Sequence, residues 1–367
     1  MKLRSSTFLF VVAGIAGCFA LSALAGAQDP PIPPAPPAPP SFEAPVPPAP
    51  PVDSSGFATL ESPAAPAAPA VPAVPISPSE PPMPPSWSQR HSMNVSDGHH
   101  HPITNCSDLN IRFDDRDAVM KSEERTVTKA EAPTLRVHPH KNGGVQVEGW
   151  DKDVYSVTAC KAAADYDGSA ERILSQIKLS IQGGEVSTTG PDEEHDWTVY
   201  LLIRAPKSAD IDLETANGPL SLYGVEGKLT AHAVNGPITL RDFSGDADVR
   251  ATNGPISIEG SSGSLRVHTE NGPISINLKG TTWNGTGLSA DAKNGPLTLF
   301  VPADYKSSFS VESRNYSPMS CRASICENAR KTWDDNDRRI EFGASPAMIR
   351  LSTVNGPVSV QSPREDM

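Results

Sequence analysis

The tripeptide Asn-Gly-Pro constrains this chain more than any other feature, because it recurs six times in the second half of the 367 residues. The first four copies are 18 residues apart, and a degenerate copy stands at Asn315. Self-similarity at a fixed period is typical of repeat architectures, in which each repeat is one supersecondary unit. The copies are Asn217-Gly218-Pro219, Asn235-Gly236-Pro237, Asn253-Gly254-Pro255, Asn271-Gly272-Pro273, Asn294-Gly295-Pro296 and Asn355-Gly356-Pro357.

Apolar or small residues recur at every second position on both sides of each tripeptide. In the first copy Ile211, Leu213 and Thr215 precede it, and Leu220 and Leu222 follow it. The position between the last two holds only Ser or Thr in all six copies. Alternation with a period of two indicates β-strands with one buried face. Each repeat is therefore predicted to contain two half-buried strands.

The proline decides how the two strands of a repeat are joined. Asn-Gly commonly forms a two-residue hairpin, but the next residue then donates its N–H across the hairpin, and proline has none. We therefore expect a corner in which Asn or Gly adopts the left-handed conformation and Pro starts the next strand from an extended Gly. Equivalent strands would stack about 4.8 Å apart, with Asn side chains hydrogen-bonded along the corner. The predicted fold class is all-β, a β-solenoid or two-sheet coiled β-sandwich of about 18-residue repeats.

The segment Thr215-Ala216-Asn217-Gly218-Pro219-Leu220-Ser221-Leu222 and its copies, followed by Gly-containing turns, resemble the bacterial putative-adhesin β-strand-repeat family, also called toastrack domains. The resemblance covers about residues 130–362 and is clearest over 210–301. It implies an exported all-β domain of short coiling strands, and it supplies no catalytic residues. The segment 281–287 and the loop between Cys321 and Cys326 depart from the period, so a binding feature particular to this protein is expected there.

The first 27 residues are predicted to be an export signal, because basic residues precede an apolar run and Ala25-Gly26-Ala27 is a small-residue cleavage site. Two alternatives stay open. One is an uncleaved anchor, and the other is lipidation of Cys18, since Ile15-Ala16-Gly17-Cys18 resembles a lipoprotein box. The expected location is the periplasm, the cell surface or the medium. No later stretch holds the ~18 apolar residues of a membrane span, so none is expected in the mature chain.

Residues 28–105 are predicted to be a disordered stalk rich in Pro and Ala, and most of the 38 prolines lie here. Proline lacks a backbone donor and fixes φ, which rules out helices and central strands and favours extended polyproline II. Two interpretations remain: a spacer that holds the next domain away from a surface, or a dispensable leader. The histidines at 99–101 are interpreted as part of a solvated linker.

Residues 106–205 are predicted to be the N-terminal β-rich part of the repeat domain, residues 206–362 the Asn-Gly-Pro repeat domain, and residues 363–367 a tail. One short helix is expected at Ser169–Ile177, where Ser169 would be the N-cap. Strands are expected, from alternation and β-branched content, at Ile111–Phe113, Val145–Val147, Tyr155–Val157 and Trp197–Ile203.

Four cysteines follow the export signal, and an even number in an oxidising compartment favours two disulfides. Three connectivities are possible. Cys321 and Cys326 are near enough in sequence to close a loop, which leaves Cys106 to pair with Cys160. Four free buried thiols are the alternative. The Cys-x4-Cys spacing has no second matching pair, so it does not indicate zinc.

The sequence predicts no catalytic residues, no cofactor and no metal site. The outward position three before each Asn holds Glu214, His232, Arg250, His268 and Asp291. In a stack the two histidines would lie about 10 Å apart, twice the strand spacing, with the arginine between them, which is too far for a shared metal ion. The acidic runs at 192–196 and 334–337 lack the alternating ligands and central Gly of a calcium loop.

The leading functional hypothesis is a non-enzymatic exported module, an adhesin or a cell-envelope scaffold, that binds an unknown surface protein or glycan. The net charge of −12 and the low aromatic content argue against nucleic-acid binding. One alternative is a glycan-binding or polysaccharide-cleaving β-helix that uses the outer Ser/Thr and charged ladders, or the segment 281–287, where Trp283 would stack on a sugar. Another, from family analogy alone, is the sensor domain of an envelope-stress system.

Overall fold

The computed structural model describes residues 91–94, 102–114, 116–140, 142–191, 195–315, 317–333, 337–344 and 346–363. The predicted signal peptide with Cys18, most of the predicted stalk, and residues 192–194, 334–336 and 364–367 lie outside the described residues. Every described residue belongs to one compact unit, Pro78–Met367.

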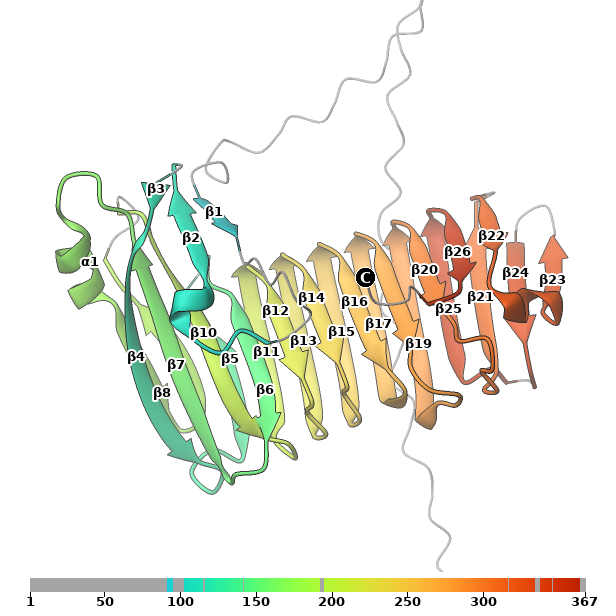
Figure 1. Cartoon of the computed structure of the whole chain (residues 1–367), viewed down its shortest axis with the longest axis horizontal. Coiled ribbons are helices and arrows are strands. Elements are labelled where there is room, and N and C mark those ends of the chain that lie inside the picture. Colours follow the sequence, from blue (N-terminus) through green and yellow to red (C-terminus); the bar gives the residue numbers. More distant parts are fainter. Residues whose placement is uncertain are drawn as a thin grey trace, which may run out of the picture. The chain divides into compact units, whose positions relative to one another are not determined.

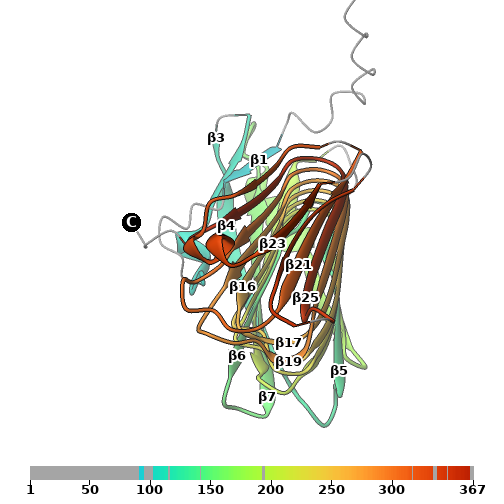
Figure 2. The same ribbon diagram turned by 90° about the vertical axis from the view of Figure 1, so that its right-hand side faces the viewer.

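Two large β-sheets, here called sheet I and sheet II, face each other in this unit (Figures 1 and 2). In spatial order sheet I comprises β22 (Met319–Cys321), β26 (Val358–Gln361), β20 (Leu297–Phe300), β18 (Ile274–Leu278), β16 (Ile256–Gly260), β14 (Ile238–Arg241), β12 (Leu220–Tyr223), β6 (Val145–Trp150), β10 (Trp197–Pro206), β7 (Val154–Ala163) and β4 (Val119–Thr128). Sheet II comprises β23 (Arg330–Trp333), β24 (Asp337–Phe342), β21 (Phe309–Arg314), β25 (Ile349–Asn355), β19 (Asn284–Asn294), β17 (Ser262–Asn271), β15 (Asp246–Asn253), β13 (Lys228–Asn235), β11 (Asp210–Asn217), β5 (Thr134–His138), β9 (Glu185–Thr189) and β8 (Lys178–Gln182).

The remaining elements are small. A separate three-stranded sheet contains β1 (His91–Asn94), β2 (Asn110–Phe113) and β3 (Arg116–Asp117). The helical segments are η2 (Cys106–Asp108), α1 (Ala170–Gln176) and η3 (Ser324–Glu327). The helix and the four strands predicted between residues 106 and 205 are therefore confirmed. In the described part of the chain no helix has the length and apolar character needed to cross a membrane.

Each repeat forms one coil that passes from sheet II to sheet I at its Asn-Gly-Pro corner. The strand before the corner pairs in parallel with its equivalent in the next repeat, so that Thr215 stands opposite Ala233, and the strand after it does the same in sheet I. Side chains such as Leu213, Leu220 and Leu222 are fully buried between the sheets. The predicted two-sheet coiled β-sandwich is confirmed, and the corner is not a hairpin.

The asparagines form the predicted ladder along the corner. From Asn217 onward, each Nδ2 donates to the Oδ1 of its neighbour over 2.9–3.1 Å. The series begins earlier than the repeat, because Asn142 accepts from Asn217, and it ends at the degenerate copy, where Asn315 donates to Asn355. In spatial order the ladder is Asn142, Asn217, Asn235, Asn253, Asn271, Asn294, Asn355 and Asn315.

The expected left-handed conformation at the corners is wrong for the six Asn-Gly-Pro copies. Their asparagines are not among the described residues with positive φ, and Gly218 and Gly295, with φ of 157° and 159°, are close to extended. Only the degenerate corner is left-handed, at Asn315 (φ 52°). Glycine is required for a different reason: a Cβ on Gly254 would lie 2.1 Å from the carbonyl oxygen of Gly236 in the preceding coil.

The last coil does not occupy the last place in the stack. Strands β25 and β26 lie between the coil of β19 and β20 and the coil of β21 and β22 (Figure 1). The antiparallel strands β24 and β23 then complete sheet II beyond β21. Spatial order therefore departs from chain order at this end of the domain.

Both predicted disulfides are present. Cys106 is bonded to Cys160, 54 residues apart, and Cys321 to Cys326, five residues apart. The first joins η2 to β7 in sheet I, and the second closes the loop between β22 and η3.

Candidate functional site

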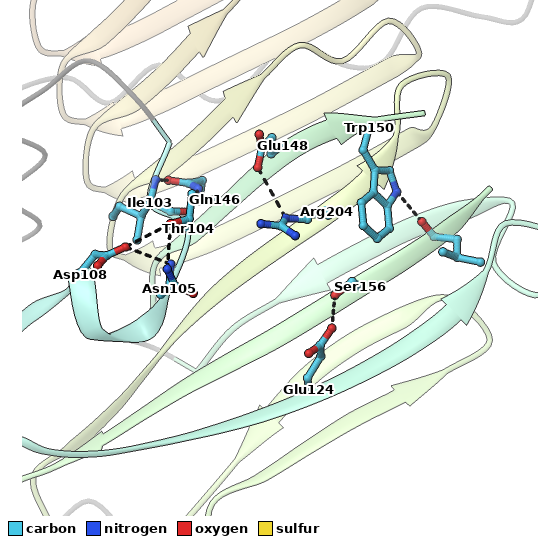
Figure 3. Close-up of polar contacts among 11 residues, drawn as sticks. Ile103, Thr104, Asn105, Asp108, Glu124, Gln146, Glu148, Trp150, Ser156 and Arg204 are labelled. Carbon is cyan, nitrogen blue, oxygen red and sulfur yellow. Dashed lines mark hydrogen bonds and ion pairs between the residues drawn. The ribbon is translucent and has the colours of Figure 1, made fainter. Parts of the chain in front are cut away.

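A groove of about 480 Å³ opens on the outward face of sheet I, at its N-terminal end (Figure 3). Its floor is formed by β4, β7, β10 and β6, and one wall by residues 103–107. This volume lies within the range of small-molecule sites, which are ~300–1,000 Å³. We refer to residues 102–109, which carry that wall, as the strap.

Three attachments hold the strap on the sheet. The disulfide ties Cys106 to β7. The buried Gln146 side chain accepts a hydrogen bond from the Ile103 N–H (2.9 Å) and donates one to the Ile103 carbonyl (2.7 Å). Leu109 packs into a small core with Tyr200 and other residues of the outer face of sheet I. The wall of the groove is therefore built in advance of any ligand.

Acidic and hydroxyl side chains meet on the floor. The Ser156 hydroxyl donates to Glu124 Oε1 over 2.6 Å, from β7 to β4. Arg204 Nε, on β10, lies 3.8 Å from Glu148 Oε2, on β6. Strand register explains the cluster, because Ser156, Arg204 and Glu148 stand opposite one another on three neighbouring strands. The groove thus presents hydrogen-bond acceptors and one guanidinium within reach of a single ligand (Figure 3).

Trp150 lies at the end of β6, next to these polar residues (Figure 3). Its indole N–H donates to the Val154 carbonyl over 2.8 Å, and the Lys152 ammonium lies 4.5 Å from the centre of its ring. Both contacts are local, so Trp150 closes the turn between β6 and β7 and does not line the groove.

The predicted role of Trp283 as a sugar-stacking residue is wrong. Its side chain is 4% exposed and belongs to the main core. The indole N–H donates to the Gly263 carbonyl (3.0 Å), and the backbone N–H donates to Ser307 Oγ (2.9 Å). The irregular segment 281–287 therefore turns its aromatic residue inward, because the indole buries a large apolar area there.

The five outward residues that precede the corners, here called the charged stripe, lie on successive strands of sheet II, as the sequence predicts. Glu214, His232, Arg250, His268 and Asp291 stand opposite one another from β11 to β19. The two histidines are separated by the strand that carries Arg250. Among the described residues no group of three or more His, Cys, Asp or Glu is arranged to hold a metal ion.

Sequence reasoning missed the groove because its residues come from five separate segments. One signal pointed toward it: Asn142-Gly143-Gly144-Val145-Gln146-Val147 is an early variant of the corner motif, and it places Gln146 at the outward Ser/Thr position. In the structure Gln146 stands opposite Ser221 and anchors the strap.

Comparison with known proteins identifies similar folds and no sequence relatives. No protein-family profile matches the chain, and no curated protein sequence matches it. Similar solved structures include a "putative cell adhesion protein" from Clostridium sporogenes (8% identity, 67% of this chain, 100% of the other, TM-score 0.29). A second is a "putative adhesin" from Bacteroides fragilis, with 8% identity over 66% of this chain and 97% of the other, and a TM-score of 0.37. A third is a "putative lipid binding protein" from Parabacteroides distasonis, with 9% identity over 65% of this chain and 97% of the other, and a TM-score of 0.29.

At 8–9% identity the likeness concerns the fold alone.

Proposed function

We propose that this protein is an exported, non-enzymatic binding module, an adhesin or a cell-envelope scaffold, whose groove on sheet I holds a surface ligand. The observation that carries the proposal is the groove itself. Polar side chains from four strands and the strap converge there on a preformed cavity. Both carboxylates in it have neighbours, Ser156 for Glu124 and Arg204 for Glu148, which suits them to fixed hydrogen-bonding roles.

Two further features support an exported binding module. The disulfides, Cys106–Cys160 and Cys321–Cys326, suit a protein that works outside the reducing cytoplasm. The stack of parallel coils gives a rigid support, because every coil is hydrogen-bonded to its neighbours along two sheets and one corner. A binding surface on such a support needs little reorganisation when the ligand arrives.

The proposal is tested by filling the groove. Thr158 lies on its floor, on the same rung as Glu124, so Thr158→Trp should occupy the cavity. The matched control is Thr230→Trp, at an exposed outward position of sheet II. Labelled full-length protein is titrated onto isolated cell-envelope material and onto immobilised extracellular matrix.

Saturable binding that Thr158→Trp weakens at least tenfold, and that Thr230→Trp leaves unchanged, supports the proposal. Thermal unfolding followed by circular dichroism confirms that both variants fold. Equal binding by both variants contradicts a role for the groove. Turnover of an envelope polysaccharide, seen as shortened chains by mass spectrometry, contradicts the non-enzymatic part.

A further inference from the structure

We propose that the ligand of the groove is a neutral saccharide chain, with one sugar in the groove and the following sugars along the hydroxyl row of sheet I. This inference rests on the proposed function and names the ligand class of the same site. The hydroxyl row consists of Ser221, Thr239, Ser257, Ser275, Thr298, Ser359 and Ser320.

The charge of the groove favours a neutral ligand. Two carboxylates, Glu124 and Glu148, stand against one guanidinium, and that guanidinium already lies beside Glu148. An anionic ligand would have to enter next to both carboxylates, and like charges in proximity are unfavourable. Sugar hydroxyls, in contrast, donate to carboxylates, and such charge-assisted hydrogen bonds are stronger than neutral ones.

The other polar groups of the groove also suit a ligand rich in hydroxyls. Thr104, Ser107, Ser122 and Thr158 line it. A hydroxyl both donates and accepts, and its hydrogen rotates to suit the partner. Sugar hydroxyls have the same dual capacity, so complementary pairs can form in either direction. A long acyl chain offers these groups no hydrogen-bonding partner.

Apolar contact is available beside the polar groups. Leu202 contributes to the floor and Ile103 to the wall, at the junction with the small outer core. Sites for small molecules combine apolar lining with a few placed polar groups. The C–H face of a pyranose can lie against these residues while its hydroxyls point toward Glu124 and Arg204.

The hydroxyl row is in register with the groove, and the strap, which covers the buried Gln146, lies between the two. Gln146 and Leu202, at the groove, lie on the rung that continues into Ser221 on β12. From there one Ser or Thr follows on every strand of sheet I as far as β22, at the strand spacing of about 4.8 Å. All of these side chains are at least partly exposed. A linear chain that leaves the groove in this direction passes over the strap and then meets a regular series of donors and acceptors.

The experiment uses full-length protein on an array of neutral and anionic oligosaccharides of graded length, followed by titration calorimetry with the best neutral probe. We expect binding to neutral sugars, weaker or no binding to uronate-containing and sialylated ones, and affinity that rises with chain length. Glu124→Gln and Glu148→Gln should each lower affinity about tenfold, as expected for the loss of a charge-assisted hydrogen bond. Glu214→Gln, on the outward face of sheet II, is the control and should have no effect.

A second variant tests the row separately from the groove. Ser257→Trp, three strands from β6, should weaken binding of long oligosaccharides and leave a disaccharide unaffected. Preference for anionic sugars, or equal affinity for short and long chains, overturns the proposal. If no sugar binds while the Thr158→Trp variant still loses envelope binding, the ligand class is wrong and the proposed function stands. If no sugar binds and the Thr158→Trp variant binds envelope material normally, both the ligand class and the proposed function are wrong.

Discussion

Replacing the corner glycine Gly254 by alanine tests the close-approach explanation of the Asn-Gly-Pro motif. The new Cβ would lie 2.1 Å from the Gly236 carbonyl oxygen and 2.8 Å from its carbon, and both are backbone atoms. Neither atom can swing aside as a side chain would. The two coils must therefore separate at the corner by about 0.9 Å to reach the 3.0 Å below which real Cβ contacts essentially do not occur.

The separation acts on hydrogen bonds that hold the same two coils together. The Gly236 N–H donates to the Asn253 carbonyl over 3.1 Å, and the Ile238 N–H donates to the Pro255 carbonyl over 2.9 Å. Adding 0.9 Å stretches both beyond the length of a hydrogen bond. Two lost bonds at ~1 kcal/mol each, with an overpacking term of ~1–3 kcal/mol, give a loss of about 3–5 kcal/mol in the free energy of unfolding.

The matched control is Gly260→Ala in the same coil. A Cβ there meets only the Phe243 carbonyl oxygen, at 4.0 Å, which is ordinary van der Waals contact. Both substitutions reduce the entropy of the unfolded chain equally, an effect of ~0.4–1 kcal/mol in favour of folding. The control should therefore be neutral or slightly stabilising, and the comparison isolates the corner contact.

The assay is urea unfolding of both variants followed by far-ultraviolet circular dichroism, with hydrogen exchange of the corner amides. For a domain of this size a loss of 3–5 kcal/mol lowers the melting temperature by on the order of 10 °C. Exchange should accelerate at Gly236 and Ile238 before it does in distant strands, because repeat proteins respond locally. Equal stability of the two variants would refute the close-approach explanation.

Three further predictions concern the ladder, a disulfide and acid. Asn253→Ala removes two exposed ladder bonds and should lower the free energy of unfolding by about 1–2 kcal/mol; an unchanged urea midpoint would show that the asparagines only shape the corner. Replacing both Cys106 and Cys160 by serine should lower the free energy of unfolding by about 4 kcal/mol, because this disulfide closes a loop of 54 residues. The same variant should lose groove binding, whereas retained binding would show that the strap keeps its position without the disulfide. Partial burial raises the pKa of Glu123, but the hydrogen bond and charge of Lys161, with those of Arg125, outweigh it and hold that pKa below 4.5. The stability from this pair is therefore present above pH 4.5 and lost as pH falls below it, and Glu123→Gln should flatten that part of the stability curve in acid titrations.

Much of the repeat domain could be predicted because its information is local and repeated. Alternation around Leu213 and Leu220 predicts the buried faces, and the missing N–H of Pro219 excludes a hairpin. The outward residues Glu214 and His232 lie on the predicted stripe. Each of these inferences needs only the neighbouring residues and the spacing to the next copy.

The groove could not be predicted in the same way. Glu124, Gln146, Ser156 and Arg204 are brought together by a parallel pairing of β10 with β6 and antiparallel pairings of β7 with β10 and β4. No period relates these segments, so their register is decided by the packing of the whole N-terminal part. The sugar-stacking role of Trp283 was predicted wrongly for a related reason. An irregular insertion has no alternation of apolar and polar residues, so the sequence does not indicate whether a side chain in it faces the core or the solvent.

By itself, the sequence determined that the repeat part of this protein is a stack of coils, each of which turns at an Asn-Gly-Pro corner, and which side chains of the repeats fill the core. Only the tertiary structure decided the order of the coils at the far end. The corner of Asn355 presents Gly356, whose α-carbon can approach the Gly295 carbonyl closely, so this coil fits directly on the regular stack. The degenerate corner has Tyr316 in place of glycine, takes a left-handed Asn315, and accepts the Gly356 N–H through the Ser317 hydroxyl. In the stack the earlier segment, β21 and β22, lies outside the later one, β25 and β26.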